Sequence, residues 1–342
     1  MAEFNFTQAV AATTWTIEHN MDAAGVVMDI IIDNTGTLEK ALPTSTVEID
    51  SNTITVTFPS AQSGYARLIE GGDQVTVDVN WSIDDISLST YDSKSYDVNP
   101  YHGFNGMYIK ADGLTMFLVN ENDNKIYQHS MSTAWDISTS TFDGEVLNTS
   151  AEGEETRGIE FKPDGTKMYI LKMNLSNIDS PEIEQYTLST AWDVSTATPD
   201  SVSYTISEGA GMSNIRFSKD GDKLFMPDPS QDSVRQYSLA TDWDISTASY
   251  DFQQVVGSVG GTPRDSYFNP TGDQMILLDN DSPAKVWLYD LSAAFTVNTA
   301  ILNSTFDFTF SDFPVVLGFS SDGSKMFVGD SEWKIYQYST NI

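Results

Sequence analysis

The chain is built largely from an internal repeat of about 52 residues, and a period of that length limits the fold to a few repeat architectures. One phrase reads HSMSTAWDISTST at 129–141, YTLSTAWDVSTAT at 186–198 and YSLATDWDISTAS at 237–249, with a diverged copy, YDLSAAFTVNTA, at 289–300. A second phrase precedes each of these and places a glycine between two apolar segments. Its five copies contain Gly113, Gly165, Gly221, Gly272 and Gly323. Five repeat units are therefore present.

Within one unit the hydrophobic pattern has period two, which is typical of strands rather than helices. The second unit contains GIEFK, KMYILK, EIEQYTL and DSVSYTI, and the turn between the first two segments reads PDGT. Asp-Gly between alternating segments is a strong hairpin signal, because glycine adopts positive φ without steric cost. Four short strands in each of several repeats predict the blades of a β-propeller.

The last unit ends without a Trp-Asp loop or a fourth strand, so the ring needs another strand to close. Residues 86–98, ISLSTYDSKSYDV, resemble the outer-strand segment of the other units. Pairing this segment with the last unit would remove an exposed sheet edge. We therefore expect an all-β chain whose residues 86–342 form a five-bladed propeller, with an N-terminal strand closing the last blade. An open stack of repeats is the alternative.

Residues 1–70 lack the repeat and form a separate small domain. Their alternating segments, among them TTWTIEHN, VVMDIIID, STVEID and NTITVTF, are separated by Asp-, Asn- and Gly-containing turns and predict a small β-sandwich. Residues 71–85 would then be the connector to the propeller.

The N-terminal segment resembles a small β-domain that recurs in bacteriophage tail-fibre and related virion proteins. The similarity lies in the pattern W-x-I-x-H-N, then V-V-x-D-x-x-x-D-N-x-G, N-x-I-T-V-T-F and S-G-Y-A. These residues are Trp15, Ile17, His19, Asn20, Val26, Val27, Asp33, Gly36, Asn52, Val56, Phe58, Ser63 and Gly64. Family members usually have Leu-Gly after His-Asn and Pro before Val-Val, whereas this chain has Met21-Asp22 and Gly25. The LSTAWDIST repeats are similar to propeller repeats of marine phage and bacterial surface proteins.

The resemblance implies a non-enzymatic virion structural protein, such as a tail fibre, an appendage or an exterior decoration, that presents a propeller to host-surface glycan. It implies contacts with other virion proteins through residues 1–70, assembly in the host cytoplasm, a place on the virion exterior and a homo-oligomer, with a trimer expected by analogy with fibres. A carbohydrate-active enzyme on a propeller and a bacterial surface scaffold protein are the alternatives.

Charge and composition restrict the partners further. The chain has 17 Lys and Arg against 49 Asp and Glu, a formal net charge of −32, which disfavours nucleic acid and anionic membranes. It has no cysteine, and its longest apolar stretch, 25–32, is too short to cross a membrane. We expect neither nucleic-acid binding nor membrane insertion.

The candidate ligand-binding residues lie in loops that a propeller gathers around one mouth of its channel. The loops between second and third strands each carry at least two acids: Glu121 and Asp123, Asp179 and Glu182, Asp228 and Asp232, Asp279 and Asp281, and Asp330 and Glu332. Arg157 and Arg264 each lie four residues before an inner-strand phenylalanine. We interpret this rim as a polar face for glycan or Ca²⁺, with no other cofactor expected. The competing interpretation is solvated loops whose acids the arginines neutralise.

Other conspicuous residues are expected to be structural. The repeated Trp-Asp loops are interpreted as packing and turn elements rather than sugar-stacking shelves. His19, His102 and His129 are too scattered to suggest a metal site, and no catalytic residue is predicted.

Overall fold

The computed structural model describes residues 3–18, 26–34, 37–40, 45–50, 53–70, 81–98, 104–149, 154–174, 181–207, 209, 211–256, 261–308 and 313–342. The chain divides into two compact units, Met1–Asp78 and Val79–Ile342. Among the described residues, no helix is both long enough and apolar enough to span a bilayer.

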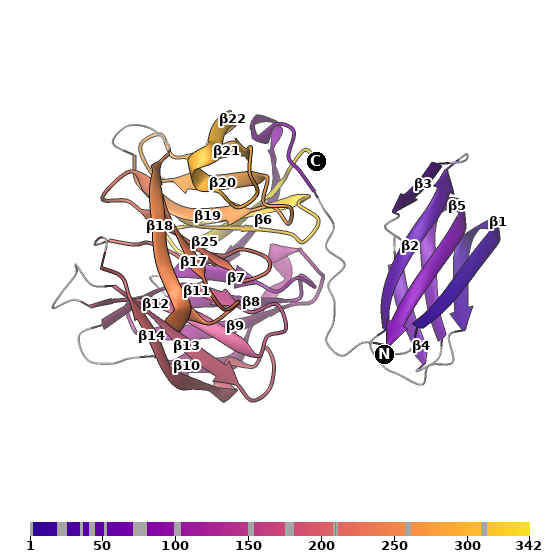
Figure 1. Cartoon of the computed structure of the whole chain (residues 1–342), viewed down its shortest axis with the longest axis horizontal. Helices are drawn as coiled ribbons and strands as arrows, with labels where there is room; N and C mark the ends of the chain where they lie inside the picture. The colour runs from indigo at the N-terminus through magenta and orange to yellow at the C-terminus, as the bar shows by residue number, and fades with distance from the viewer. Residues whose placement is uncertain are drawn as a thin grey trace. The chain divides into compact units, whose positions relative to one another are not determined.

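The first unit is a single antiparallel sheet (Figure 1). Its strands are β1 (Glu3–Glu18), β2 (Val26–Asn34), β3 (Thr37–Lys40), β4 (Ser45–Asp50) and β5 (Thr53–Glu70). The long strand β5 organises the sheet: β1 pairs along most of it, β4 pairs with its first residues, and β2 pairs with its last.

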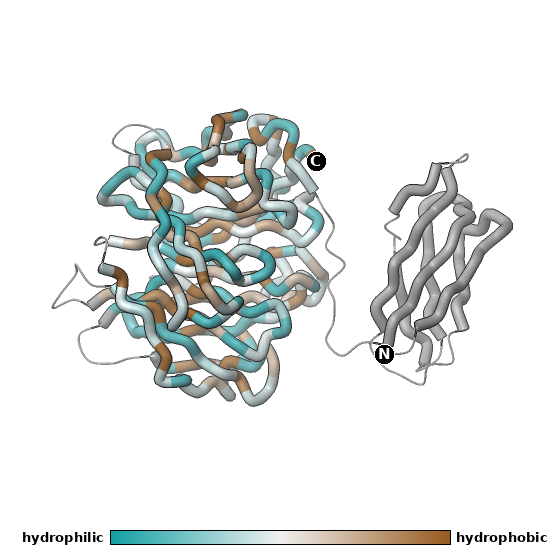
Figure 2. The backbone as a smooth tube through the Cα atoms, in the orientation of Figure 1, coloured by the Kyte–Doolittle hydropathy of each residue, from teal (hydrophilic) through white to brown (hydrophobic). Residues whose placement is uncertain are grey.

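The second unit is a propeller of five four-stranded antiparallel sheets, as predicted (Figure 1). From the inner strand outward, blade 1 is β7 (Phe104–Ile109), β8 (Thr115–Asn120), β9 (Lys125–Met131) and β10 (Ser140–Asn148), and blade 2 is β11 (Glu154–Phe161), β12 (Lys167–Asn174), β13 (Glu182–Leu188) and β14 (Ala197–Thr205). Blade 3 is β15 (Arg216–Phe217), β16 (Lys223–Asp228), β17 (Ser233–Leu239) and β18 (Ala248–Val255), and blade 4 is β19 (Pro263–Phe268), β20 (Gln274–Asp279), β21 (Lys285–Leu291) and β22 (Ala300–Asp307). Blade 5 is β23 (Pro314–Phe319), β24 (Lys325–Asp330), β25 (Lys334–Ser339) and β6 (Thr90–Asp97). Apolar side chains between neighbouring sheets form the core, and hydrophobic and hydrophilic stretches alternate along the propeller backbone (Figure 2).

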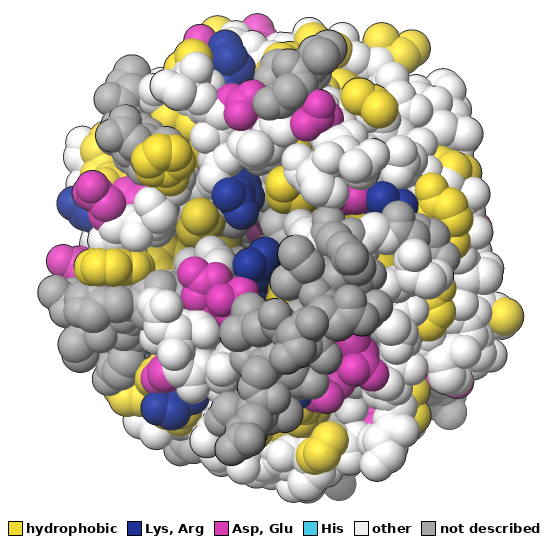
Figure 3. Space-filling view, turned by 90° about the vertical axis from the view of Figure 1, so that its left-hand side faces the viewer, with side chains coloured by type: hydrophobic (Ala, Val, Ile, Leu, Met, Phe, Trp, Pro, Cys, Tyr) yellow, Lys and Arg dark blue, Asp and Glu magenta, His cyan; other side chains and the backbone are white. Residues whose placement is uncertain are grey.

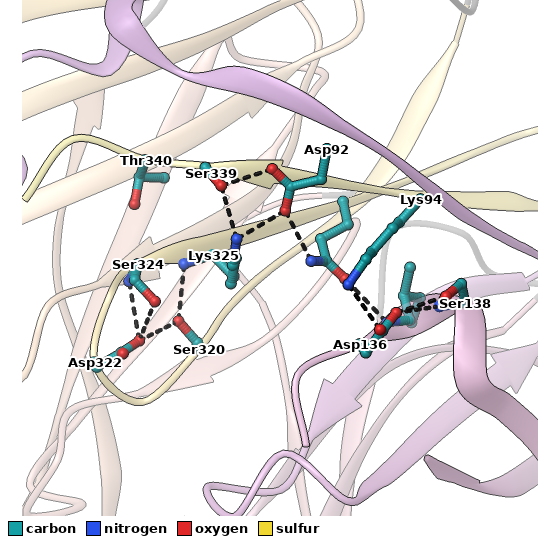
Figure 4. Close-up of polar contacts among 12 residues, drawn as sticks. Asp92, Lys94, Asp136, Ser138, Ser320, Asp322, Ser324, Lys325, Ser339 and Thr340 are labelled. Atoms are coloured by element: carbon teal, nitrogen blue, oxygen red, sulfur yellow. Dashed lines mark hydrogen bonds and ion pairs between the residues drawn. The ribbon is translucent and has the colours of Figure 1, made fainter. Parts of the chain in front are cut away.

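The N-terminal strand β6 closes the ring, which confirms the predicted closure. It pairs with β25 from Thr90 to Asp97. The carboxylate of Asp92 accepts hydrogen bonds from Ser339 Oγ at 2.6 Å, Gln337 Nε2 at 2.8 Å and Lys325 Nζ at 2.9 Å (Figure 4). The same strand joins blade 5 to blade 1, because Lys94 Nζ lies 2.7 Å from the Asp136 carboxylate (Figure 4).

The Trp-Asp loops lie between the third and fourth strands, and their aromatic residues cover the glycine turns. Trp192 has φ of 67° and its ring fills the space that a Cβ on Gly165 would need. Trp135, Trp243 and Phe295 cover the glycine turns of blades 1, 3 and 4 in the same way. In each Trp-containing loop the aspartate caps a short 3₁₀ turn, η2 (Ile137–Thr139), η3 (Val194–Thr196) or η4 (Ile245–Thr247). These loops pack and close turns.

Blade 5 obtains its covering ring from a different part of the chain. Trp81 stacks on Phe319 at a ring-centroid distance of 5.6 Å and covers the Gly323 turn. Ile83 is fully buried in the same cluster, and Asp85 caps the short turn η1 (Ile86–Leu88). The propeller thus includes residues from the stretch that the sequence suggested as a connector.

Candidate functional site

The inner strands β7, β11, β15, β19 and β23 surround the channel and bring equivalent repeat positions together. One position per strand, immediately before the terminal aromatic or isoleucine, contributes Tyr108, Glu160, Arg216, Tyr267 and Gly318. A second position, four residues before that terminal residue and nearer the loops between second and third strands, contributes Asn105, Arg157, Ser213, Arg264 and Val315. The channel therefore has an interior layer and a mouth layer.

The interior layer is organised by the guanidinium of Arg216, which contacts the four other inner strands. It donates to Asp265 Oδ2 and to Leu317 O, both at 2.9 Å, and to Ser266 O at 3.0 Å. The carbonyl oxygens of Met107 and Ile159 lie 3.4 Å from its terminal nitrogens. One side chain thus links all five blades at the axis.

Two buried carboxyl groups share this arginine. Glu160 lies 3.5 Å from Arg216, and Asp265 Oδ2 also accepts from the backbone N–H of Leu317 at 2.9 Å. Burial raises the pKa of Glu160 to about 7 and that of Asp265 to about 6, although Arg216 opposes both shifts. Near neutral pH the layer therefore holds a proton that the same carboxyl groups would release in water.

The mouth layer gathers Glu121, the residue after β8, with groups from the three inner strands β7, β11 and β19. Asn105 Nδ2 donates to Glu121 Oε2. Burial raises the pKa of Glu121 and the charge of Glu155 adds to the shift, whereas Arg157 and Arg264 partly oppose it. On the face of the molecule drawn in Figure 3, Lys and Arg side chains lie beside Asp and Glu side chains near the centre.

The two mouth arginines differ in their partners. Arg157 donates from Nη2 and Nε to Glu155 Oε2, at 2.9 and 3.2 Å. Arg264 makes no ion pair within the described part of the chain, and its Nε is buried there without a hydrogen-bond partner. Burial and the charge of Arg157 lower the pKa of Arg264, which Glu121 opposes. The guanidinium of Arg157 is therefore paired with a carboxylate, whereas that of Arg264 has no ion pair among the described residues.

Several acids of the predicted rim have structural contacts instead. Asp228 pairs with Arg235 at 2.7 Å, Asp279 Oδ1 accepts from the Thr262 and Asp281 backbone N–H groups, and Asp330 Oδ1 accepts from the N–H groups of Glu332 and Lys334. All three end the second strand of a blade and are at most 1% exposed. Their repetition reflects turn formation.

The remaining predicted residues lie in the same loops. Asp123 accepts from Tyr127 and Lys125, Asp281 accepts from Thr262, Asp232 has a positive φ of 49°, and Glu332 is exposed. Glu182 begins β13, and Asp179 lies outside the described residues, as do His19 and His102.

His129 is buried and lies 3.1 Å from the Tyr96 hydroxyl on β6, and burial lowers its pKa to about 4. Within the described ranges, no cluster of three His, Asp or Glu side chains could hold a metal ion.

The sequence interpretation missed Asn105, Glu155 and the whole interior layer. A signal was present, because the residue before the terminal aromatic reads Glu in EF and Arg in RF, charged types within otherwise apolar inner strands. Aligning the five inner strands on that aromatic would have placed Glu160 and Arg216 in one ring.

Comparison with known families identifies the chain. The sequence family described as "Lactonase, 7-bladed beta-propeller" matches residues 109–294, more than half of the chain. The chain belongs to this lactonase family. Its member described here has five blades, and the matched region runs from the end of β7 to the loop after β21. No curated protein matches the chain.

Solved structures similar to this lactonase-family propeller have low sequence identity to it. A putative 6-phosphogluconolactonase from Bacteroides uniformis has 13% identity and a TM-score of 0.43, covering 65% of this chain and 62% of its own. A functionally unknown protein from Desulfotomaculum acetoxidans has 12% identity and a TM-score of 0.41, covering 66% and 62%. A protein from Lactobacillus plantarum has 10% identity and a TM-score of 0.43, covering 66% and 63%. The chain spans less than two thirds of the length of each.

Membership of a lactonase family corrects the functional prediction. A non-enzymatic virion structural protein was the wrong expectation, and the alternative of an enzyme on a propeller agrees better with the family. The error arose because that expectation was drawn from resemblances to phage proteins, and the acids repeated in each blade were then interpreted as a binding rim. The family match does not reach residues 1–70, so the resemblance of that segment to a phage domain stays a prediction, as do the partners and location that it implies.

Proposed function

We propose that this chain is a lactonase-type hydrolase, which opens a cyclic ester at the channel mouth. The observation that carries the proposal is the position of Glu121, a half-buried carboxyl of raised pKa beside two arginines, in a propeller of the lactonase family. A carboxylate of raised pKa is a stronger base than an ordinary glutamate.

The chemistry needs a base, a source of positive charge and one water molecule. In the proposed reaction, water attacks the ester carbonyl carbon and Glu121 takes its proton. The ring C–O bond then breaks, and the proton passes to the ring oxygen, so that lactone and water give a hydroxy acid. Arg157, held by Glu155, supplies positive charge toward the oxygen that becomes negative during the attack. Asn105 is a positioning residue, since it donates to the Glu121 carboxylate.

The proposal is tested by hydrolysis of δ-gluconolactone, followed as acid release and corrected for spontaneous opening. Replacing the base in E121Q should lower kcat/KM about 100-fold, within the range that general-base groups contribute. The acidic limb of the wild-type rate profile should lie above the pH at which an ordinary glutamate titrates, because the pKa of Glu121 is raised. E332Q is the matched control, since Glu332 is an exposed acid on the same face, and it should keep the wild-type rate. Wild-type hydrolysis no faster than the spontaneous reaction, or equal rates for E121Q and wild type, would contradict the proposal.

A further inference from the structure

The unequal pairing of the two mouth arginines points to an anion subsite. Arg157 is engaged by Glu155 through two hydrogen bonds. Arg264 is partly buried and has no carboxylate partner in the described portions of the chain, and its Nε is fully shielded from solvent there. A buried donor without an acceptor loses the hydrogen bonds that water would give it. The buried Nε of Arg264, which has no acceptor among the described residues, is therefore a donor that a ligand could satisfy.

We propose that Arg264 binds an oxyanion, such as a phosphate, sulfate or carboxylate group, beside the base Glu121. Its planar array of donors fits the oxygens of such groups, and charge-assisted hydrogen bonds are stronger than neutral ones. The inference rests on the proposed function for the identity of the base, but binding itself requires no reaction. The oxyanion comes either from a substituent of the substrate or from a free ion.

Anion binding at Arg264 should also change the protonation of Glu121. The groups facing Glu121 are Asn105, Glu155, Arg157 and Arg264. Arg264 lowers the pKa of Glu121, and a bound anion opposes that effect, so the pKa of Glu121 should rise further when the anion binds. Occupancy of the subsite would thus change the pKa of the base.

The first experiment measures sulfate binding to the full chain by calorimetry, because sulfate does not itself titrate near neutral pH. R264Q should weaken sulfate binding about tenfold or more, from the loss of a charged hydrogen bond. E155Q should strengthen it, since Arg157 is then released toward the anion. K285Q is the control: Lys285 pairs with Asp307 on the outer strands, 2.6 Å apart and away from the channel. No sulfate binding by the wild type, or equal affinity in R264Q and wild type, would overturn the proposal.

Repeating the titration in buffers of different ionisation enthalpy measures the protons taken up. Sulfate binding to the wild type should be accompanied by proton uptake above the pH at which an ordinary glutamate titrates, and E121Q should bind sulfate without it. Uptake unchanged in E121Q would overturn the link between subsite and base. The E155Q result keeps the test valid if R264Q does not fold.

Competition identifies the source of the anion. Glucose 6-phosphate should displace sulfate if the oxyanion is part of a sugar ligand, whereas glucose should not. If neither displaces sulfate, the site takes the free ion, and Arg264 remains its ligand. Sulfate binding through Arg264 without lactone hydrolysis would refute the proposed function alone, and hydrolysis without sulfate binding would refute the subsite alone.

Discussion

At the scale of single residues, the channel interior shows how a charged side chain is retained in an apolar environment. Arg216 has two carboxyl partners and several backbone acceptors, so its donors are satisfied inside the ring. The carboxyl groups are less well compensated, because one cation serves both, and burial raises the pKa of each. Stability at this layer therefore depends on pH.

Glu160 should make the protein less stable as the pH rises. Its pKa is 4.5 in an ordinary setting and about 7 here, so the unfolded chain releases the proton at a pH where the folded chain still holds it. Linkage then removes up to about 3 kcal/mol from the free energy of unfolding between pH 4.5 and pH 7. E160Q mimics the protonated form. In urea unfolding, the free energy of unfolding of E160Q relative to the wild type should increase by up to that amount from pH 5 to pH 8. A constant difference between the two proteins across this range would show that Glu160 does not titrate there.

At the scale of elements, an aromatic ring from the loop between the third and fourth strands covers the glycine turn of the same blade in blades 1 to 4. Trp243 contacts Phe217 at a ring-centroid distance of 5.1 Å, and its carbonyl oxygen accepts from the Tyr169 hydroxyl of the neighbouring blade at 2.6 Å. The ring also covers Gly221, whose φ of 76° favours glycine. The loop therefore joins two blades as well as closing one.

Truncating this ring should open a cavity at the blade junction. W243A should lower the free energy of unfolding by about 3 kcal/mol, as expected for loss of a large aromatic ring. W243F should cost about 1 kcal/mol, because blade 4 already uses Phe295 over Gly272. Equal losses for the two variants in urea unfolding would contradict a covering role for the ring.

At the scale of the whole molecule, the two ends of the propeller unit meet in blade 5. Strand β6 supplies the outer strand, Trp81 the covering ring and Asp92 the polar contacts to β24 and β25. Without these residues β25 would have an unpaired edge, which favours association with other chains.

Truncation at two points should separate the roles of the N-terminal residues. A chain of residues 79–342 keeps the complete compact unit and should not aggregate, with the thermal transition of the propeller retained. A chain of residues 99–342 lacks Trp81 and β6 and should aggregate, which light scattering measures. A chain of residues 99–342 that stays in solution without aggregating would show that closure is not needed.

The sequence predicted the ring because the repeats are visible in it. Five glycine turns indicate five blades, and an outer-strand segment that precedes the first unit indicates closure. It predicted less of the site, because loop acids such as Asp228 and Glu121 look alike until their contacts are seen. The shared offset from phenylalanine predicted that Arg157 and Arg264 lie together. It could not predict that Glu155 pairs with Arg157, while the Arg264 Nε has no acceptor among the described residues. The family could not be inferred from the N-terminal motif, which lies outside the matched region.

The reach of Arg216 also limits the number of blades. One guanidinium touches every other inner strand at distances of 2.9 to 3.5 Å, so the circumference of the ring is matched to the span of a single side chain. Chains made of near-identical units readily gain or lose a copy by duplication or deletion. Here an added unit would widen the axis beyond that span and leave the carbonyl groups of several strands without their donor. The contacts of Arg216 therefore fit a ring of five inner strands, and we expect this arginine to be incompatible with a wider ring.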